Sequence, residues 1–182
     1  MVHDPSLQLV GPIAWARVFA AWRRGEAWQE SWQAHWRERG FDSWDAWRSN
    51  YIAPLAPEMR DWRLYRLTDL AAVADFYGAP TKGWIQHHYN GALTRPLREI
   101  APALETHEKV RAIMEDFPPA TLLTAVRDEA GRIILVDGMH RACALTLLAE
   151  RNDLPSAVVA VAIAAVRAAE LAPLGTGEAP AT

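Results

Sequence analysis

The sequence predicts an α+β fold in which a tryptophan-rich helical region precedes a small mixed β-sheet. Apolar residues recur at steps of three and four through the first third of the 182-residue chain, which favours amphipathic helices. In the last third, two runs rich in β-branched residues enclose a helical pattern, as expected for strands joined by a helix. Hydrophobic residues make up 51% of the chain and charged residues 23%, so we expect a globular protein with a substantial core.

The N-terminal region is expected to hold three helices, at 13–24, 26–39 and 43–52. The first two stop at glycines, which commonly end helices, and the third begins at Asp42 as its N-cap. The second helix carries Trp28, Trp32 and Trp36 one turn apart. Such a stripe is mainly structural in most proteins, so we expect it to pack; contact with a partner protein or stacking on a base are the alternatives.

The middle of the chain is expected to hold a short strand, a shaped loop and further helix. Residues 61–67 alternate with a period near two, which indicates a strand. Residues 76–95 are rich in Gly, Pro, Thr and Asn and fit neither template, so we expect an irregular loop with a functional purpose. Helical spacing resumes at 97–117, with a break at Pro102 and a new start capped by Thr106.

The C-terminal part is expected to form strands at 120–128, 132–136 and 156–164, with a helix from 139 to 150 before the last strand. We divide the chain into a tryptophan-rich helical region at 1–60, a core at 61–168 and a flexible tail at 169–182, because the tail is dominated by Ala, Pro and Gly.

The segment Asp137-Gly138-Met139-His140-Arg141 lies where a buried strand turns into a helix. Gly138 permits a sharp turn, and the first turn of the helix offers unpaired N–H groups with a partial positive charge. Cations are disfavoured there unless an anion joins them, so His140 and Arg141 indicate a phosphate-bearing ligand. The alternative is a capped turn in which these residues only satisfy local hydrogen bonds.

Together with residues 118–131 before it and 154–163 after it, this segment resembles the nucleotide-binding core of the ParB/sulfiredoxin superfamily, over about residues 97–163. The resemblance implies that His140, Arg141 and the helix N-terminus hold nucleotide phosphates, with Gly138 giving room and Met139 beside them. Met139 stands where sulfiredoxins have a catalytic cysteine, so we do not expect thiol repair. An arginine-rich box and a following helix-turn-helix domain are absent from the pattern, so we do not expect a role in DNA partition.

What remains similar is the branch of small-molecule kinases. This resemblance implies ATP or another nucleoside triphosphate with Mg²⁺, and a small hydroxylated metabolite as acceptor. Asp137 is then the expected base or metal ligand, and His140 a second catalytic candidate. The alternative is a non-catalytic nucleotide-sensing or protein-interaction module that uses the tryptophan-rich helices, which could also join copies of the chain.

Weaker candidates surround this segment. Lys82 is a further phosphate contact to consider, and Trp84, in an irregular loop, is the better stacking candidate. Glu99 and Glu105 are second carboxylates to consider, although solvated helix charges are the commoner case. The pair at 87–88, two histidines, has no acidic or cysteine partner at ligand spacing, so we do not expect a metal there.

Composition limits the setting and the partners. A single cysteine, Cys143, and a start without a signal-peptide pattern lead us to expect a cytoplasmic protein. The longest apolar run near the start is interrupted by Gly11, Pro12 and Arg17, so we expect no membrane span. The net charge of -3 supplies no overall basic field, so we do not expect a nucleic-acid partner.

Overall fold

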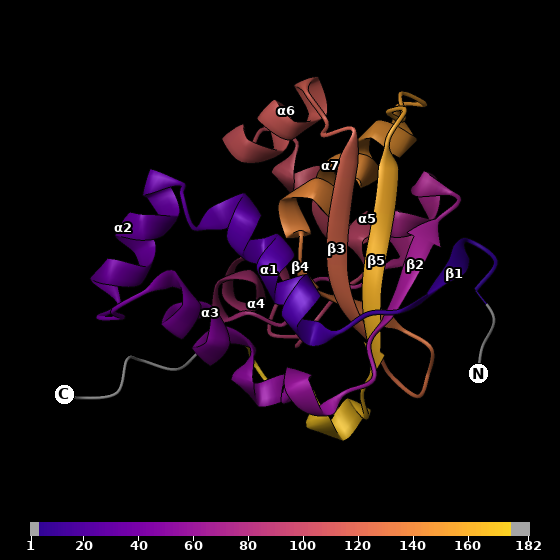
Figure 1. Cartoon of the computed structure of the whole chain (residues 1–182). Coiled ribbons are helices and arrows are strands. Elements are labelled where there is room, and N and C mark those ends of the chain that lie inside the picture. Colours follow the sequence, from indigo (N-terminus) through magenta and orange to yellow (C-terminus); the bar gives the residue numbers. More distant parts are fainter. Residues whose placement is uncertain (1–3, 176–182) are drawn as a thin grey trace.

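A five-stranded mixed sheet forms the centre of the computed structural model, which describes residues 4–175 (Figure 1). The spatial order is β1-β2-β5-β3-β4. The strands β3 and β5 pair in parallel, and the other neighbours are antiparallel. The strands are β1 (Leu7–Pro12), β2 (Arg63–Leu67), β3 (Ala120–Arg127), β4 (Ile133–Asp137) and β5 (Val158–Ala165). The predicted α+β class with a small mixed sheet is confirmed.

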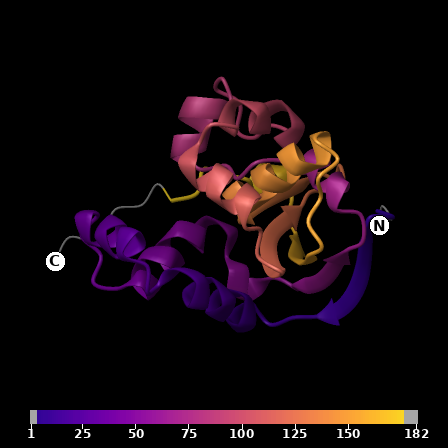
Figure 2. The same cartoon turned by 90° about the horizontal axis from the view of Figure 1, so that it is seen from above.

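Helices cover both faces of this sheet (Figure 2). The N-terminal helices α1 to α3 lie on one side, and α4 to α7 lie on the other. Their bounds are α1 (Trp15–Glu26), α2 (Glu30–Glu38), α3 (Trp44–Ile52), α4 (Lys82–His88), α5 (Leu97–Ile100), α6 (Glu108–Glu115) and α7 (Met139–Glu150). Short 3₁₀ turns connect several of them.

Side chains alternate between the two faces of the sheet along each strand, and they form two separate cores. On β4, Ile133 and Leu135 join the core beneath α7, whereas Ile134 and Val136 join the core beneath the N-terminal helices. All four side chains are buried, because both faces of the sheet are covered. The N-terminal core is built largely from aromatic rings, of which Trp22, Trp44, Trp47 and Trp62 are buried. Most of the tryptophans are therefore used in packing.

The stripe on α2 is only partly structural. Trp32 and Trp36 are half-buried against the N-terminal core, as expected. Trp28 lies before the helix begins and is 72% exposed, so the prediction that it packs is wrong. Its ring nitrogen donates to the carbonyl of Arg24 one turn earlier. The helix predicted at 26–39 instead begins at Glu30, because α1 does not stop at Gly25 but continues to Glu26.

Two predicted helix caps are wrong by one residue. Ser43, not Asp42, caps α3, and its hydroxyl accepts a hydrogen bond from the backbone N–H of Ala46. His107, not Thr106, is the N-cap of α6, and it makes no capping hydrogen bond. Both errors lie within the one or two residues by which helix ends are defined.

The segment predicted as a loop at 76–95 contains α4. Thr81 caps this helix by accepting from the backbone N–H of Trp84. The rest of the segment is irregular but well packed: Tyr77 bridges to β4, and the hydroxyl of the buried Tyr89 donates to the carbonyl of Ala79. The loop prediction was therefore only partly correct, because a seven-residue helix is too short to show a periodicity.

Both ends of the described chain are tied to the rest of the fold. The strand β1, which the sequence did not predict, pairs with β2 and so places part of the 1–60 region in the central sheet. Near the other end, Leu174 is fully buried and its N–H donates to the carbonyl of Pro80 (2.7 Å). The tail predicted to be flexible from residue 169 is thus packed as far as 175, and 176–182 lie outside the described residues. Within 4–175, no helix has the length and apolar character needed to cross a bilayer.

Candidate functional site

The predicted strand, turn and helix are present at the signature segment. The strand β4 ends at Asp137, Gly138 turns the chain with φ of +94°, and α7 begins at Met139. A Cβ at Gly138 would lie 2.5 Å from Leu123 Cδ2 and 3.3 Å from a terminal nitrogen of Arg141, so only glycine fits. No side chain caps α7, so its first N–H groups remain available to an incoming acceptor.

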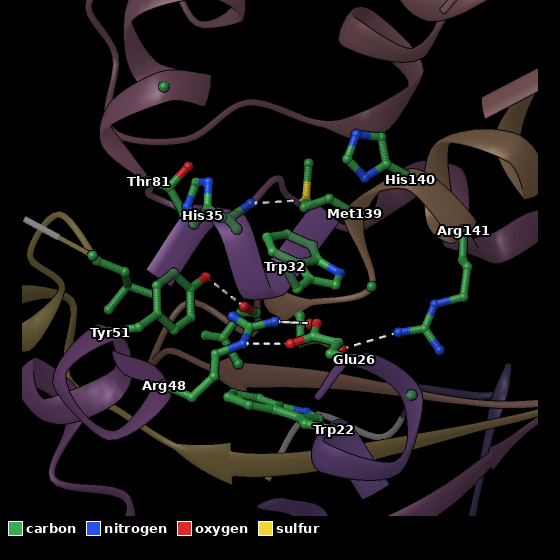
Figure 3. Close-up of a pocket in the computed structure, with 18 of the residues that line it drawn as sticks. Trp22, Glu26, Trp32, His35, Arg48, Tyr51, Thr81, Met139, His140 and Arg141 are labelled. Atoms are coloured by element: carbon green, nitrogen blue, oxygen red, sulfur yellow. Dashed lines mark hydrogen bonds and ion pairs between the residues drawn. The ribbon is translucent and has the colours of Figure 1, made fainter. Parts of the chain in front are cut away.

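A cavity of about 1570 Å³ lies in front of this helix start (Figure 3). One wall comes from α1 to α3, the opposite wall comes from α4 and α6, and the floor comes from β3, β4 and the first turn of α7. Every residue of the signature from 137 to 141 lines it. Lys82 and Trp84, predicted from sequence as further contacts, also line it, so the fold brings these candidates together.

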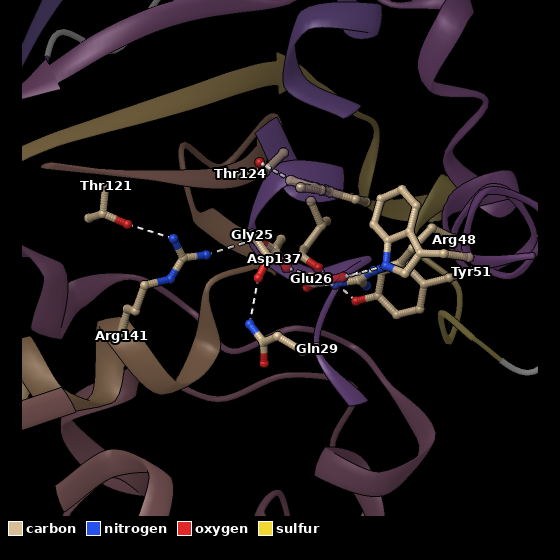
Figure 4. A network of polar contacts seen from close by, with 12 residues as sticks. Gly25, Glu26, Gln29, Arg48, Tyr51, Thr121, Thr124, Asp137 and Arg141 are labelled. Carbon is tan, nitrogen blue, oxygen red and sulfur yellow. Dashed lines mark hydrogen bonds and ion pairs between the residues drawn. The ribbon is translucent and has the colours of Figure 1, made fainter. Parts of the chain in front are cut away.

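Arg141 reaches back over the turn (Figure 4). One terminal nitrogen lies 3.0 Å from Asp137 Oδ2, and the other donates to the hydroxyl of Thr121 at 2.5 Å. The side chain of Arg141 is 30% exposed, whereas that of Asp137 is only 10% exposed. Arg141 is therefore at the cavity surface and in an ion pair, with no ligand needed to balance its charge.

The second oxygen of Asp137 meets a buried arginine that the sequence did not reveal. Arg48 Nη2 lies 3.0 Å from Asp137 Oδ1, and the same Nη2 together with Nε donates to the carboxylate of Glu26. Trp44 also donates to that carboxylate (3.1 Å). Asp137 thus joins two guanidinium groups, one from α3 and one from α7, and it is not the N-cap.

Aromatic rings surround the Arg48 guanidinium. Its central carbon lies 4.9 Å from the ring centroids of Trp22 and Trp47 and 4.8 Å from that of Tyr51. Burial disfavours its charge, but Asp137 and Glu26 more than compensate and raise its pKa above the ordinary value. Arg48 is therefore a permanent cation that holds the N-terminal helices against the start of α7.

His140 is held neutral. Burial, followed by electrostatic repulsion from neighbouring Lys109 and His107, lowers its pKa to about 4. Its ring lies 5.1 Å from that of His107 and 5.6 Å from that of Trp84, centroid to centroid. At neutral pH the imidazole supplies one donor and one acceptor rather than a charge. A phosphate beside it would favour the protonated form.

The signature's Met139 and the chain's only cysteine are packing residues. Met139 is buried, and its sulfur accepts a hydrogen bond from the backbone N–H of Ala79. Cys143 is fully buried one turn further along α7, and burial raises its pKa to about 12. A thiol in this state is not a nucleophile.

The remaining candidates lie away from the cavity. Glu99 and Glu105 are surface residues paired with Arg95 and Arg151, and neither lines the cavity. The histidines at 87–88 also do not line it, although the second contacts the ring of Trp84. Among residues 4–175, no three His, Cys, Asp or Glu side chains are arranged to hold a metal ion.

Asp137 does not fit the predicted role of metal ligand in this arrangement. Each of its oxygens accepts a hydrogen bond from an arginine, so a metal ion would have to displace a guanidinium group. Magnesium usually keeps several waters and binds through substrate phosphates.

No protein-family model, curated protein or solved structure matches the chain. The resemblance of residues 97–163 to the ParB/sulfiredoxin superfamily stays a prediction from the signature. What the cavity can bind is inferred from its side chains.

Proposed function

We propose that the protein binds a nucleotide whose phosphates lie at the N-terminus of α7, against His140 and Arg141. The observation that carries this proposal is that the first turn of α7, which no side chain caps, lies beside an arginine at the floor of a large cavity. Backbone N–H groups, the positive helix end and a planar guanidinium are complementary to phosphate oxygens. The resemblance to the ParB/sulfiredoxin core points to the same ligand.

The size of the cavity suits two molecules. Pockets for a single small ligand are typically on the order of 300 to 1,000 Å³, and this cavity is about 1570 Å³. A nucleoside triphosphate with its magnesium ion leaves room for a small hydroxylated metabolite. A kinase requires this, because donor and acceptor must be bound together for direct transfer.

In the proposed transfer, the acceptor hydroxyl oxygen attacks the γ-phosphorus and gives its proton to Asp137. The bond from the γ-phosphorus to the bridging oxygen breaks, and the electron pair leaves with the nucleoside diphosphate. Asp137 can accept the proton only if Arg141 turns from Oδ2 to the phosphates. Arg141 is 30% exposed, whereas Arg48 is 6% exposed and fixed by Glu26, so Arg141 is the partner that can move.

A non-catalytic binding module is the second candidate, and one observation favours it. In the structure both oxygens of Asp137 are engaged by arginines, which is an arrangement suited to holding a helix start rather than to removing a proton. An interaction surface in the tryptophan-rich region would centre on Trp28, between α1 and α2, since the tryptophans within α1 to α3 pack at least in part.

A melting experiment with ATP, CTP and GTP, each with Mg²⁺, tests nucleotide binding. A ligand that binds only the folded state at a hundred times its Kd adds about 2.7 kcal/mol. For a chain of 150–250 residues this corresponds to a rise in Tm of roughly 5 to 11 °C. Unchanged melting with all three at millimolar concentration would contradict the proposal.

The variant Asp137→Asn separates the two candidates once a nucleotide is found. Turnover is measured as release of nucleoside diphosphate, with and without a panel of hydroxylated metabolites. A kinase should lose at least about a hundredfold in turnover, on the order of a general-base contribution, while the variant still binds nucleotide. A binding module shows no metabolite-dependent turnover in either protein.

A further inference from the structure

Lys109 of α6 extends across the cavity to the opposite wall. Its ammonium lies 4.9 Å from the ring centroid of Trp32 on α2. No carboxylate pairs with Lys109 within residues 4–175. Its partner is the aromatic face, which is a weaker partner than an anion.

Near the start of α7, Lys109 adds a positive charge beyond those that are paired with carboxylates. Arg48 and Arg141 are balanced by Glu26 and Asp137, to which they are paired. His140 is neutral at physiological pH and adds no charge. The positive charge of Lys109 is therefore not balanced by the carboxylates at the helix start. Burial, opposed in part by Glu26 and Asp137, lowers the pKa of Lys109, so its cationic form is held less favourably than in water. An anion beside it would reverse this effect.

We propose that Lys109 is a phosphate-binding residue, and that Trp32, whose ring it covers in the free protein, is the surface on which the nucleobase stacks. This inference rests on the proposed function and deepens it, because it assigns both ends of the nucleotide. Lys109 turns from the ring to the phosphates at α7, and this movement uncovers the ring face. Trp32 is half-buried and lines the cavity, as stacking requires.

The signature does not contain either residue, and they come from different layers. Lys109 belongs to the helices beside α7, and Trp32 belongs to the N-terminal helices. The nucleotide would therefore lie between the two layers, with its phosphates on one side and its base on the other. While Lys109 lies on Trp32, it cannot contact the phosphates, and the base cannot stack fully on the ring. Phosphate binding and base stacking are therefore coupled.

The same helix offers a control, because Arg111 of α6 is exposed and paired with Glu115 and does not line the cavity. Lys109, two residues earlier, does line the cavity. The variants Lys109→Met and Arg111→Met each remove one positive charge from α6. Trp32→Leu and Trp32→Phe test the ring, since phenylalanine keeps an aromatic face and leucine does not.

Titration calorimetry of each protein with ATP and Mg²⁺, inorganic tripolyphosphate and adenosine gives the test. Lys109→Met should weaken ATP and tripolyphosphate by about 10- to 100-fold, the range for a hydrogen bond to a charged group, and should not weaken adenosine. Trp32→Leu should weaken ATP and adenosine by about fivefold or more but spare tripolyphosphate, and Trp32→Phe should restore most of the loss. Melting curves establish that every variant is folded.

Two results overturn the inference alone: tripolyphosphate binding by Lys109→Met that equals that of the parent, or an equal loss in Arg111→Met. Loss of adenosine binding that Trp32→Phe does not restore removes the base site. If the parent protein binds neither ATP nor tripolyphosphate, the proposed function fails first, and this inference fails with it.

Discussion

Replacing Arg48 by methionine should cost about 3 to 5 kcal/mol of the free energy of unfolding. The substitution keeps a long side chain among the surrounding rings but removes the charge that two buried carboxylates share. The side chains of Glu26 and Asp137 are only 14% and 10% exposed, so neither gains enough water to replace its partner. Breaking a buried ion pair by removing one member costs about this much, because a buried charge is left uncompensated.

The expected loss is large relative to the whole stability of the protein. Domains of this size are stable by roughly 5 to 15 kcal/mol, so the variant should be folded but marginal. A loss of 3 to 5 kcal/mol corresponds to a fall in Tm of about 6 to 20 °C for a chain of this length. Urea unfolding followed by tryptophan fluorescence measures the free energy directly.

Two controls distinguish the effect of breaking a buried ion pair from the effect of removing one positive charge. Arg98→Met breaks an ion pair with Asp75 in which both side chains are more than half exposed, and such pairs contribute about 0 to 1 kcal/mol. Adding Glu26→Gln to Arg48→Met removes one orphaned carboxylate and should recover about 1 kcal/mol or more. A loss below 1 kcal/mol in Arg48→Met would refute the view that this arginine joins the two layers.

Three further outcomes follow from the site. Gly138→Ala should lower Tm, because its Cβ would meet Leu123 at 2.5 Å in a left-handed conformation, whereas Gly25→Ala, in open space on α1, should be neutral or stabilising by up to about 1 kcal/mol. Arg141→Ala should weaken tripolyphosphate binding about tenfold or more by calorimetry and also lower Tm, since Asp137 loses a partner; undiminished binding would remove Arg141 from the phosphate site. The pKa of His140 is lowered in the folded protein, so the unfolded chain takes up a proton near pH 6.5, whereas the folded chain does so only near pH 4. The free energy of unfolding should therefore fall as the pH drops through this window, by up to about 3 kcal/mol. The variant His140→Gln should show a shallower fall over the same window in denaturant titrations.

The sequence predicted the strand, turn and helix at 132–150 because local periodicity specifies them. The strand β1 escaped prediction, because it is an edge strand interrupted by Gly11 and Pro12 and irregular in its pairing at Leu9. The helix α4 escaped because its seven residues span only two turns. Both elements are defined by the partners they meet in the fold.

The candidate site likewise has one part that the sequence predicts and another that only the fold brings together. The signature residues are contiguous in the chain, so their common place in the lining of one cavity could be predicted without a structure. The pairing of Arg48 with Asp137 joins residues 89 positions apart, and nothing in the sequence around Arg48 distinguishes it from a surface arginine. For the same reason Asp137 was expected to be free to bind a metal or accept a proton, whereas the fold has given it two partners.

The lone thiol of Cys143 provides a direct measure of how often α7 opens. Its burial and raised pKa leave it inert to thiol reagents while the helix is docked. Labelling therefore occurs only from open molecules, and its rate, divided by that of an unstructured cysteine, gives the opening equilibrium of this one helix. Since the chain has a single cysteine, the signal needs no engineered probe. The unmodified protein can thus report whether a compound that fills the cavity slows the opening of the helix at its floor.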